Sequence, residues 1–444
     1  MDDRLARALG RAWADGATWD LLTRLTELPS RLTGHPGDRA AADAVIEALA
    51  DAGVDAERRP FDVQRWDRGD TRIAVEVPDR DVTRSFEAVA LPYCPPAEVE
   101  GTLVDVGYGR PADIERADVA GNVVTATTAT PPGFDRPLHR LEKVGHAAAG
   151  GAAAFVFRNH VPGQLPPTGA LAFGHEGALP GVGVSSETGA WLEEYAGEAT
   201  ATLSVDAGTE SGTAHNVVGT LGPDTGEEVL LVAHPDAHDV AEGALDNGCG
   251  VATLVGAVRI LASVEGQLDR RVRVATVSGE ELGLLGSEAL AASLDLDDVA
   301  AVCNVDGAGR DPHLQALTHG SPATREAALR AADRANREVG VQERPHPYSD
   351  HWPFLRAGVP ALQFHSASED AEGPWERGWT HTRADTRDKA TPRTIRDHAM
   401  LVALAVLELC AADLPRVDER RLQERLEPAR EGMEAAGTWP ERWD

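Results

Sequence analysis

The sequence predicts an α/β protein with a mostly parallel mixed sheet and helices on both faces. Two observations predict this class. From about residue 213, short apolar runs alternate with longer segments whose apolar residues recur at helical spacing. The runs are nearly continuous, as in strands buried on both faces of a sheet. We expect strands at 216–220, 229–233, 272–277, 299–305 and 361–364, and helices at 250–263, 287–292, 323–339 and 394–411.

The segments on either side of this region differ from it in composition and periodicity. Residues 1–97 begin with helical periodicity and continue with alternating strands, so we expect them to pack on the α/β domain of residues 213–412. Residues 98–205 combine short valine-rich runs with many Gly and Pro residues, which indicates a small β-rich module inserted into the chain. Residues 413–444 form a charged C-terminal tail.

The chain is strongly acidic and poor in lysine. It has 72 Asp and Glu residues against 42 Lys and Arg, a formal net charge of −30, and its only lysines are Lys143 and Lys389. This charge disfavours nucleic acid and anionic membranes as partners. A lysine-poor acidic surface favours work in concentrated salt, where self-repulsion is screened; an acidic protein from a G+C-rich genome is the alternative.

The N-terminal sequence and the spacing of the cysteines indicate where in the cell the protein is expected. The N-terminus lacks the apolar region of a signal peptide, and no apolar run is expected to be long enough to span a membrane. The expected location is therefore cytoplasmic. The cysteines are widely spaced, which indicates reduced, buried thiols. They are Cys94, Cys249, Cys303 and Cys410.

Three successive strands of the predicted sheet end in histidine or acidic residues. The first is followed by His234 and Asp236, the second by Glu280 and Glu281, and the third by Asp306. Because ligands bind beyond the carboxyl ends of such strands, these side chains should meet at one edge. Imidazole and carboxylate are the groups that zinc binds. The sequence therefore predicts a metal site at this edge.

Two metals need a shared ligand and terminal ligands on each side. Asp246, in the glycine-rich stretch after His234, is placed to bridge. His234 and Asp306 are suited to complete one metal, and Glu281 with a second histidine the other. The candidate for that histidine is His381.

Five ordered motifs carry a family resemblance: HPD with ALDN, SGEELGLLGSEAL, NVDG, YSDHWPFLRAGVPAL and HTRADTRDK. Together they resemble the co-catalytic zinc exopeptidases of the aminopeptidase S and aminopeptidase Y type. The resemblance covers residues 213–412 and implies the sheet of that fold, which is phosphorylase/hydrolase-like. Residues 98–205 resemble the protease-associated domain often inserted in this family.

The resemblance implies roles for matching positions. Two zinc ions are expected, with other divalent metals as alternatives. Glu280 is implied as the general base that takes a proton from the attacking water, and Asp236 as the partner that orients His234. The implied metal ligands are His234, Asp246, Glu281, Asp306 and His381, with Asp246 bridging.

The expected activity is removal of N-terminal residues from peptides, so the expected partner is a peptide substrate. A carboxypeptidase or glutaminyl-cyclase-type relative, another amidohydrolase, or a binding module without activity are the alternatives. The cyclases use one zinc, and binding modules usually lack ligands, so the full set favours a two-metal enzyme.

Some positions near the motifs carry a second interpretation. Family members often have a tyrosine before the last ligand histidine, whereas this chain has Thr380; Tyr348 is a candidate substitute for stabilising the oxyanion. Asp350 and His351 are interpreted as packing under the site rather than as ligands. The tryptophans at 352, 375 and 379 either line a pocket or pack in the core.

Overall fold

The computed structural model describes residues 2–134, 136–367 and 378–443. The chain divides into two compact units. Unit 1 comprises Met1–Val63, Thr213–Thr380 and Asp385–Leu426, and unit 2 comprises Gln64–Gly212, His381–Ala384 and Glu427–Asp444.

Unit 1 is built on a seven-stranded part of a mixed sheet, in the order β13-β12-β14-β11-β9-β10-β8. The strands are β8 (Thr200–Leu221), β9 (Glu228–Ala233), β10 (Arg271–Thr276), β11 (Val299–Val305), β12 (His313–Leu317), β13 (Gly340–Gln342) and β14 (Ala361–Ala367). The central strands β14, β11, β9 and β10 are parallel, whereas β8 runs antiparallel to β10 and β12 runs antiparallel to β14. The expected α/β class with a mixed, mostly parallel sheet is confirmed.

The register brings the ends of the three central strands together. Ala233 of β9 lies opposite Thr276 of β10, and Val232 lies opposite Asn304 of β11. Since the strands are parallel, the residues that follow them emerge at the same edge of the sheet.

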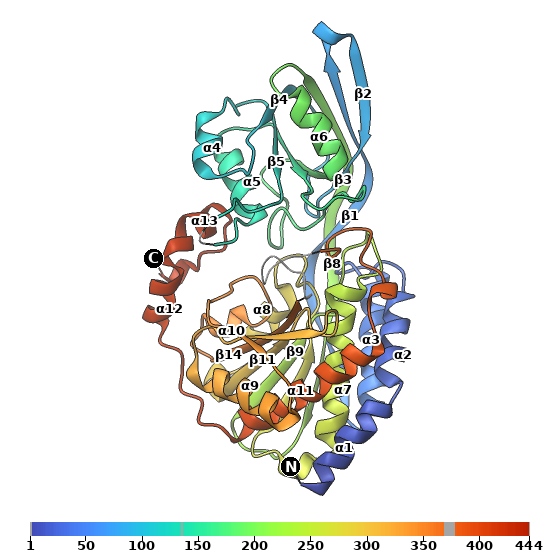
Figure 1. Cartoon of the computed structure of the whole chain (residues 1–444), viewed down its shortest axis with the longest axis vertical. Helices are drawn as coiled ribbons and strands as arrows, with labels where there is room; N and C mark the ends of the chain where they lie inside the picture. The colour runs from blue at the N-terminus through green and yellow to red at the C-terminus, as the bar shows by residue number, and fades with distance from the viewer. Residues whose placement is uncertain (1, 135, 368–377, 444) are drawn as a thin grey trace. The chain divides into compact units, whose positions relative to one another are not determined.

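Helices cover both faces of this sheet (Figure 1). Along β9, Val229 and Leu231 join one apolar core, and Leu230 and Val232 join another, as the alternation of a strand requires. The first core is lined by α1 (Asp3–Ala14), α2 (Ala17–Thr26), α3 (Pro36–Asp51), α7 (Cys249–Ser263), α9 (Pro322–Ala335) and α11 (Pro392–Ala411). The second is lined by α8 (Leu285–Ala292) and α10 (Trp352–Leu355).

One helical stretch of the described residues, Ala244–Ser263, is long and apolar enough to cross a membrane by length and composition alone. The expectation that no run reaches this length is therefore wrong. Within the fold, 89% of the apolar window is buried, because α7 packs against α11, α2 and α1. Its hydropathy is accounted for by the core of unit 1.

The observed elements differ from the predicted ones in additional short strands and in the end of one helix. Strands β12 and β13 have no counterpart in the prediction, since short strands carry little periodicity. Helix α9 ends at Ala335, before the predicted residue 339, because Asn336 adopts the left-handed conformation (φ 50°) that commonly terminates helices.

Unit 2 contains its own strands in the order β8-β4-β5-β6-β7-β3, with parallel pairing from β4 through β7. The strands are β3 (Val89–Ala90), β4 (Ala97–Asp105), β5 (Val123–Thr127), β6 (Ala154–Arg158) and β7 (Gly181–Val184), and the helices are α4 (Pro111–Arg116), α5 (Arg140–Ala149) and α6 (Ser186–Tyr195). A hairpin of β1 (Ala56–Val77) and β2 (Val82–Glu87) extends from it. The tail forms α12 (Glu419–Leu426) in unit 1 and α13 (Arg430–Ala435), which packs on α5 in unit 2.

Candidate metal centre

His234 is the first residue after β9, and its side chain is fully buried. Its Nδ1 atom lies 3.2 Å from the carbonyl oxygen and 3.4 Å from Oδ1 of Asp236. Its Nε2 atom lies 3.5 Å from Oδ1 of Asp246 and 3.9 Å from Oδ1 of Asp306. Burial lowers the pKa of His234, but the charge of Glu280 and these carboxylates raise it well above 6.5. The carboxylates around Nε2 therefore favour a positive charge at this point.

Asp236 connects the ends of β9 and β10. Its buried carboxylate accepts hydrogen bonds from the hydroxyl of Thr33 and from the backbone N–H groups of Glu280 (3.3 Å) and Glu281 (3.2 Å). Burial opposes ionisation, but the hydrogen bond with His234 and the backbone donors keep the pKa of Asp236 below 3.8. Asp236 thus orients His234 and also positions both glutamates.

Asp306 is the first residue after β11. Its Oδ2 atom accepts hydrogen bonds from the hydroxyl of Ser349 (2.6 Å) and from the amide of Gln363 (3.3 Å), which leaves Oδ1 facing His234. Although burial raises the pKa of Asp306, the nearby imidazole of His234 and the hydrogen bond from Ser349 bring it to about 2. Glu280 completes this group: its ligand atom and those of His234 and Asp306 lie within 4.8 Å of one another.

Glu280 keeps part of its side chain exposed, unlike its neighbour Glu281. Burial raises the pKa of Glu280 well above 4.5, the charge of His234 opposes this, and the charges of Asp306, Glu281 and Asp350 raise it further. A carboxyl group with a raised pKa and an accessible edge is suited to accept and return a proton.

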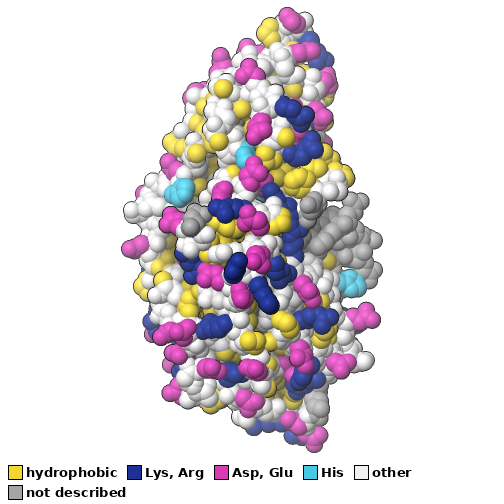
Figure 2. All heavy atoms as spheres, turned by 90° about the vertical axis from the view of Figure 1, so that its left-hand side faces the viewer, with side chains coloured by type: hydrophobic (Ala, Val, Ile, Leu, Met, Phe, Trp, Pro, Cys, Tyr) yellow, Lys and Arg dark blue, Asp and Glu magenta, His cyan; other side chains and the backbone are white. Residues whose placement is uncertain are grey.

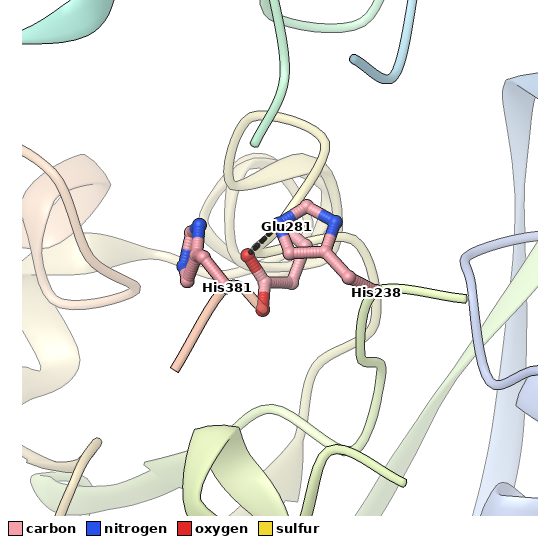
Figure 3. A group of neighbouring side chains, drawn as sticks. All are labelled: His238, Glu281 and His381. Carbon is pink, nitrogen blue, oxygen red and sulfur yellow. Dashed lines mark ion pairs between the residues drawn. The ribbon is translucent and has the colours of Figure 1, made fainter. Parts of the chain in front are cut away.

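Glu281 points toward two histidines (Figure 3). His238 Nε2 lies 2.9 Å from Glu281 Oε2, and the ligand atoms of His238, Glu281 and His381 all lie within 4.8 Å of one another. Sequence reasoning did not select His238. Its signal was its position four residues after His234 in the same HPDAHD segment.

His381 lies in a four-residue segment of unit 2 between Thr380 and Asp385 of unit 1. Within unit 2, the carbonyl oxygen of His381 accepts a hydrogen bond from the backbone N–H of Thr168 (2.8 Å), and its Nδ1 lies 3.2 Å from the Thr168 carbonyl oxygen. Its φ of 58° is in the left-handed region, which is uncommon for histidine and typical of functional sites.

A buried arginine from the N-terminal segment holds the loop that follows His234. The guanidinium of Arg31 donates hydrogen bonds to the carbonyl oxygens of Pro235 (2.8 Å), Glu242 (2.6 Å) and Gly243 (2.9 Å), and also to that of Leu25. Arg31 is only 3% exposed. Three of these contacts hold the two ends of the loop, and sequence reasoning did not assign Arg31 this role.

Asp246 and Asn247 connect this loop to helix α7 and to β11. The backbone N–H of Asp246 donates to Asp385 Oδ2 at 3.1 Å, and the peptide bond between Asp246 and Asn247 is cis. The side-chain amide of Asn247 donates to the carbonyl oxygen of Val305 and accepts from the N–H of Gly307. Asp246 is thereby held beside the end of β11.

Asp350 and His351 are both fully buried. His351 Nε2 lies 2.8 Å from the His346 carbonyl oxygen, and its Nδ1 lies 3.4 Å from the Asn304 amide, so both ring nitrogens have partners in the fold. Burial raises the pKa of Asp350 to about 8. Neither residue belongs to the two groups of ligand atoms found among the described residues.

The positions around the expected tyrosine differ in exposure. Thr380 is 3% exposed and Tyr348 is half-buried. Trp352 is 2% exposed and packs in the core, whereas Trp379 is 49% exposed. Trp375 lies outside the described residues.

The donor set fits a metal ion. The buried Nε2 atom of His234 has no hydrogen-bond partner and faces two carboxylates. Imidazole nitrogen and carboxylate oxygen are the ligands that zinc prefers, and an unpaired buried polar atom is costly unless an ion or water satisfies it. Both groups of ligand atoms lie at the residues that follow the central strands, with His381 as the exception.

Comparison with known proteins agrees with this chemistry. The profile of peptidase family M28 matches residues 216–406, and that of the PA domain matches residues 99–192. Aminopeptidase YwaD of Bacillus subtilis is 26% identical over 412 residues, covering 88% of this chain and 84% of that protein.

Solved structures share the fold. An aminopeptidase from Aneurinibacillus sp. strain AM-1 matches with a TM-score of 0.68 and 26% identity, covering 91% of this chain and 94% of that one. BSAP, described as a zinc aminopeptidase from Bacillus subtilis, matches with a TM-score of 0.68 and 24% identity over 88% of this chain and 93% of that one.

An α/β sheet that gathers histidines and carboxylates at one edge, with an inserted PA domain, defines a zinc metallopeptidase. Residues 216–406 match peptidase family M28, and the chain is similar to aminopeptidases over most of its length.

Proposed function

We propose that this chain is a di-zinc aminopeptidase that removes N-terminal residues from peptides. The observation that carries the proposal is the presence of two ligand groups. One contains His234, Glu280 and Asp306, and the other contains His238, Glu281 and His381. Asp246, the proposed bridge, belongs to neither group, but its Oδ1 atom lies 3.5 Å from His234 Nε2. The similar proteins YwaD and the Aneurinibacillus enzyme are both described as aminopeptidases, which supports this choice over a carboxypeptidase.

The ligand assignment follows the positions of the side chains. His234 and Asp306 would hold one zinc, Glu281 and His381 the other, and Asp246 would bridge them. When bound, the two ions would polarise the scissile carbonyl group and acidify the attacking water. Asp236 orients His234 through Nδ1 and keeps the backbone of Glu281 in place.

Glu280 is the proposed general base. It lies four residues after the end of β10, belongs to the group with His234 and Asp306, and is partly exposed to solvent. It would accept a proton from the attacking water at its carboxylate and return it to the leaving amine. Replacing it with glutamine removes this capacity while keeping nearly the same volume.

The cellular setting is a separate proposal. We propose that the protein is adapted to concentrated salt, on the basis of its net charge of −30 and its two lysines. Figure 2 shows acidic side chains interspersed with basic ones over the face in view.

Hydrolysis of aminoacyl-nitroanilides with free and with blocked N-termini tests the proposed activity. We expect cleavage of free substrates only, loss of activity with a chelator, and recovery with zinc. Glu280→Gln should lower kcat by roughly 10²–10⁴-fold while both metals still bind. Glu338→Gln, at an exposed position of unit 1, is the matched control and should keep wild-type activity. Cleavage of blocked substrates only would contradict the aminopeptidase assignment, and an active Glu280→Gln enzyme would contradict the assigned base.

A further inference from the structure

The proposed ligand set contains five residues, and the structure places a further imidazole, that of His238, beside Glu281. His238 follows His234 by four residues on the same loop and is only 5% exposed. Its Nε2 atom lies 2.9 Å from Oε2 of Glu281 (Figure 3). A buried imidazole whose nitrogen faces a proposed ligand carboxylate is either a hydrogen-bond partner of that carboxylate or a ligand of the same metal.

The distance between the two atoms suits shared ligation. Two ligands at about 2.0–2.1 Å from a tetrahedral zinc lie about 3.3 Å apart. The separation of His238 Nε2 and Glu281 Oε2 is 2.9 Å, and both atoms belong to the group that includes His381 within 4.8 Å. Small movements of the side chains therefore bring both atoms to ligand distance from one ion.

We propose that His238 is a protein ligand of the metal held by Glu281, which makes this position a His–Glu–His site. The inference rests on the proposed two-metal function, and it adds a ligand that the sequence-derived set lacks. The two metal positions then differ in chemistry. The position of His234 has one imidazole and carboxylates, whereas the position of Glu281 has two imidazoles in addition to its carboxylates.

The loop that carries His238 is held in place by close packing. The N–H of Ala237 donates to the carbonyl oxygen of Arg31. Gly243 has a φ of 58°, and a Cβ atom at this residue would lie 2.2 Å from Cβ of Ala237. Only glycine permits this approach, so the backbone next to His238 is preorganised before a metal binds.

The extra imidazole predicts unequal metal affinities. Imidazole is a strong ligand for zinc, and losing even a residue that only supports a ligand typically costs 10–100-fold in metal affinity. The position with two imidazoles should therefore fill first during titration of the metal-free protein and empty last in the presence of a chelator.

The test compares the wild-type protein with His238→Ala and His238→Gln. Glutamine retains a donor for Glu281 and much of the volume, but it is a poor zinc ligand, so it separates ligation from hydrogen bonding. His313→Ala, at an exposed position of the same unit, is the matched control. Metal-free samples are first compared by circular dichroism and urea unfolding, so that only folded variants enter the metal measurements.

Two measurements on the zinc-loaded proteins do not depend on activity. X-ray absorption at the zinc edge should find three imidazoles for two zinc ions in the wild type and the control, supplied by His234, His238 and His381, and two in both His238 variants. Competition with a chromogenic chelator should show that the tighter of the two zinc dissociation constants rises at least 10–100-fold in both variants.

The results that would overturn ligation by His238 differ from those that would overturn the proposed aminopeptidase activity. Two imidazoles for two zinc ions in the wild type, or wild-type zinc affinity in His238→Gln, would overturn ligation by His238 while leaving the aminopeptidase proposal intact. A wild-type protein that binds two zinc ions through three imidazoles but cleaves no aminoacyl substrate would support His238 and refute the proposed activity. A protein that binds no zinc would overturn both.

Discussion

The carboxylate of Asp385 accepts a hydrogen bond from the backbone N–H of Asp246, at 3.1 Å. It also accepts one from Leu245, at 2.6 Å. The residue proposed to bridge two metals is therefore held through its backbone by an acid that lies more than a hundred residues later in the chain. Such supporting contacts set the orientation of ligands and hence metal affinity.

Replacing Asp385 tests this contact. Asp385→Asn leaves one acceptor oxygen for two backbone donors, so Asp246 should lose part of its fixed position. We expect zinc affinity, measured by chelator competition, to fall roughly 10–100-fold while the fold is kept. Asp388→Asn, three residues later and exposed, should leave affinity unchanged. Equal affinities in the two variants would show that Asp385 has no supporting role.

Arg31 should contribute to stability as well as to the site. Arg31→Met leaves the carbonyl oxygens of Pro235, Glu242 and Gly243 without their buried donor. We expect the free energy of unfolding in urea to fall by about 3 kcal/mol or more, because unsatisfied buried acceptors are costly. The control Arg24→Met removes an exposed ion pair with Glu47 and should cost at most about 1 kcal/mol. Similar losses in both variants would contradict the role given to Arg31.

Asp38 should make stability depend on pH. Its carboxylate accepts hydrogen bonds from the hydroxyl of Ser278 and the N–H of Gly34, and burial raises its pKa to about 7. The unfolded chain releases this proton near pH 3.8, so the folded state binds more protons between pH 3.8 and 7. The contribution of Asp38 to stability is therefore full below pH 3.8 and is lost as pH rises through 7.

Asp38→Asn should remove this dependence. The amide can still accept from Gly34 and can donate to Ser278, so the contacts are kept without a titrating group. We expect the variant to gain roughly 2–4 kcal/mol relative to the wild type between pH 4 and pH 8. Urea unfolding of both proteins across this range provides the measurement. Parallel pH profiles would show that Asp38 does not titrate near neutrality.

The acidic surface should make folding depend on salt. Repulsion among the excess of acids is screened when ionic strength is high. We expect the melting temperature and the activity to rise with KCl between about 0.1 M and 2 M. Sucrose at matched osmolality, which does not screen charge, serves as the control. Full stability in dilute buffer would refute adaptation to salt.

The strand ends were predictable because they follow local rules. A nearly continuous apolar run predicts a buried strand, and parallel strands place their following residues at one edge. This reasoning locates His234, Glu280 and Asp306 from the sequence, and the register of β9, β10 and β11 brings them together. The assignment of each residue to a metal remains a prediction.

Other contributions could not be predicted locally. His238 and Arg31 carry no periodic signal, since one lies in a loop and the other follows a helix. The partner of His238 is Glu281, which lies more than forty residues later in the sequence. The partners of Arg31 are backbone carbonyl oxygens of the 235–243 segment, which no side-chain pattern reveals. The role of the long apolar helix α7 also became clear only from the fold, because composition alone does not distinguish a core helix from a membrane span.

The sequence by itself determined the α/β class and the resemblance to zinc exopeptidases, because strand periodicity and the residues at strand ends are local properties. The tertiary structure decided which groups lie together. Asp236 accepts hydrogen bonds from the backbone N–H groups of Glu280 and Glu281, and Asp385 accepts one from that of Asp246. His238 lies 2.9 Å from Glu281. Contacts between distant segments depend on how helices and loops pack over the sheet. That packing is a property of the whole chain, which no single motif encodes.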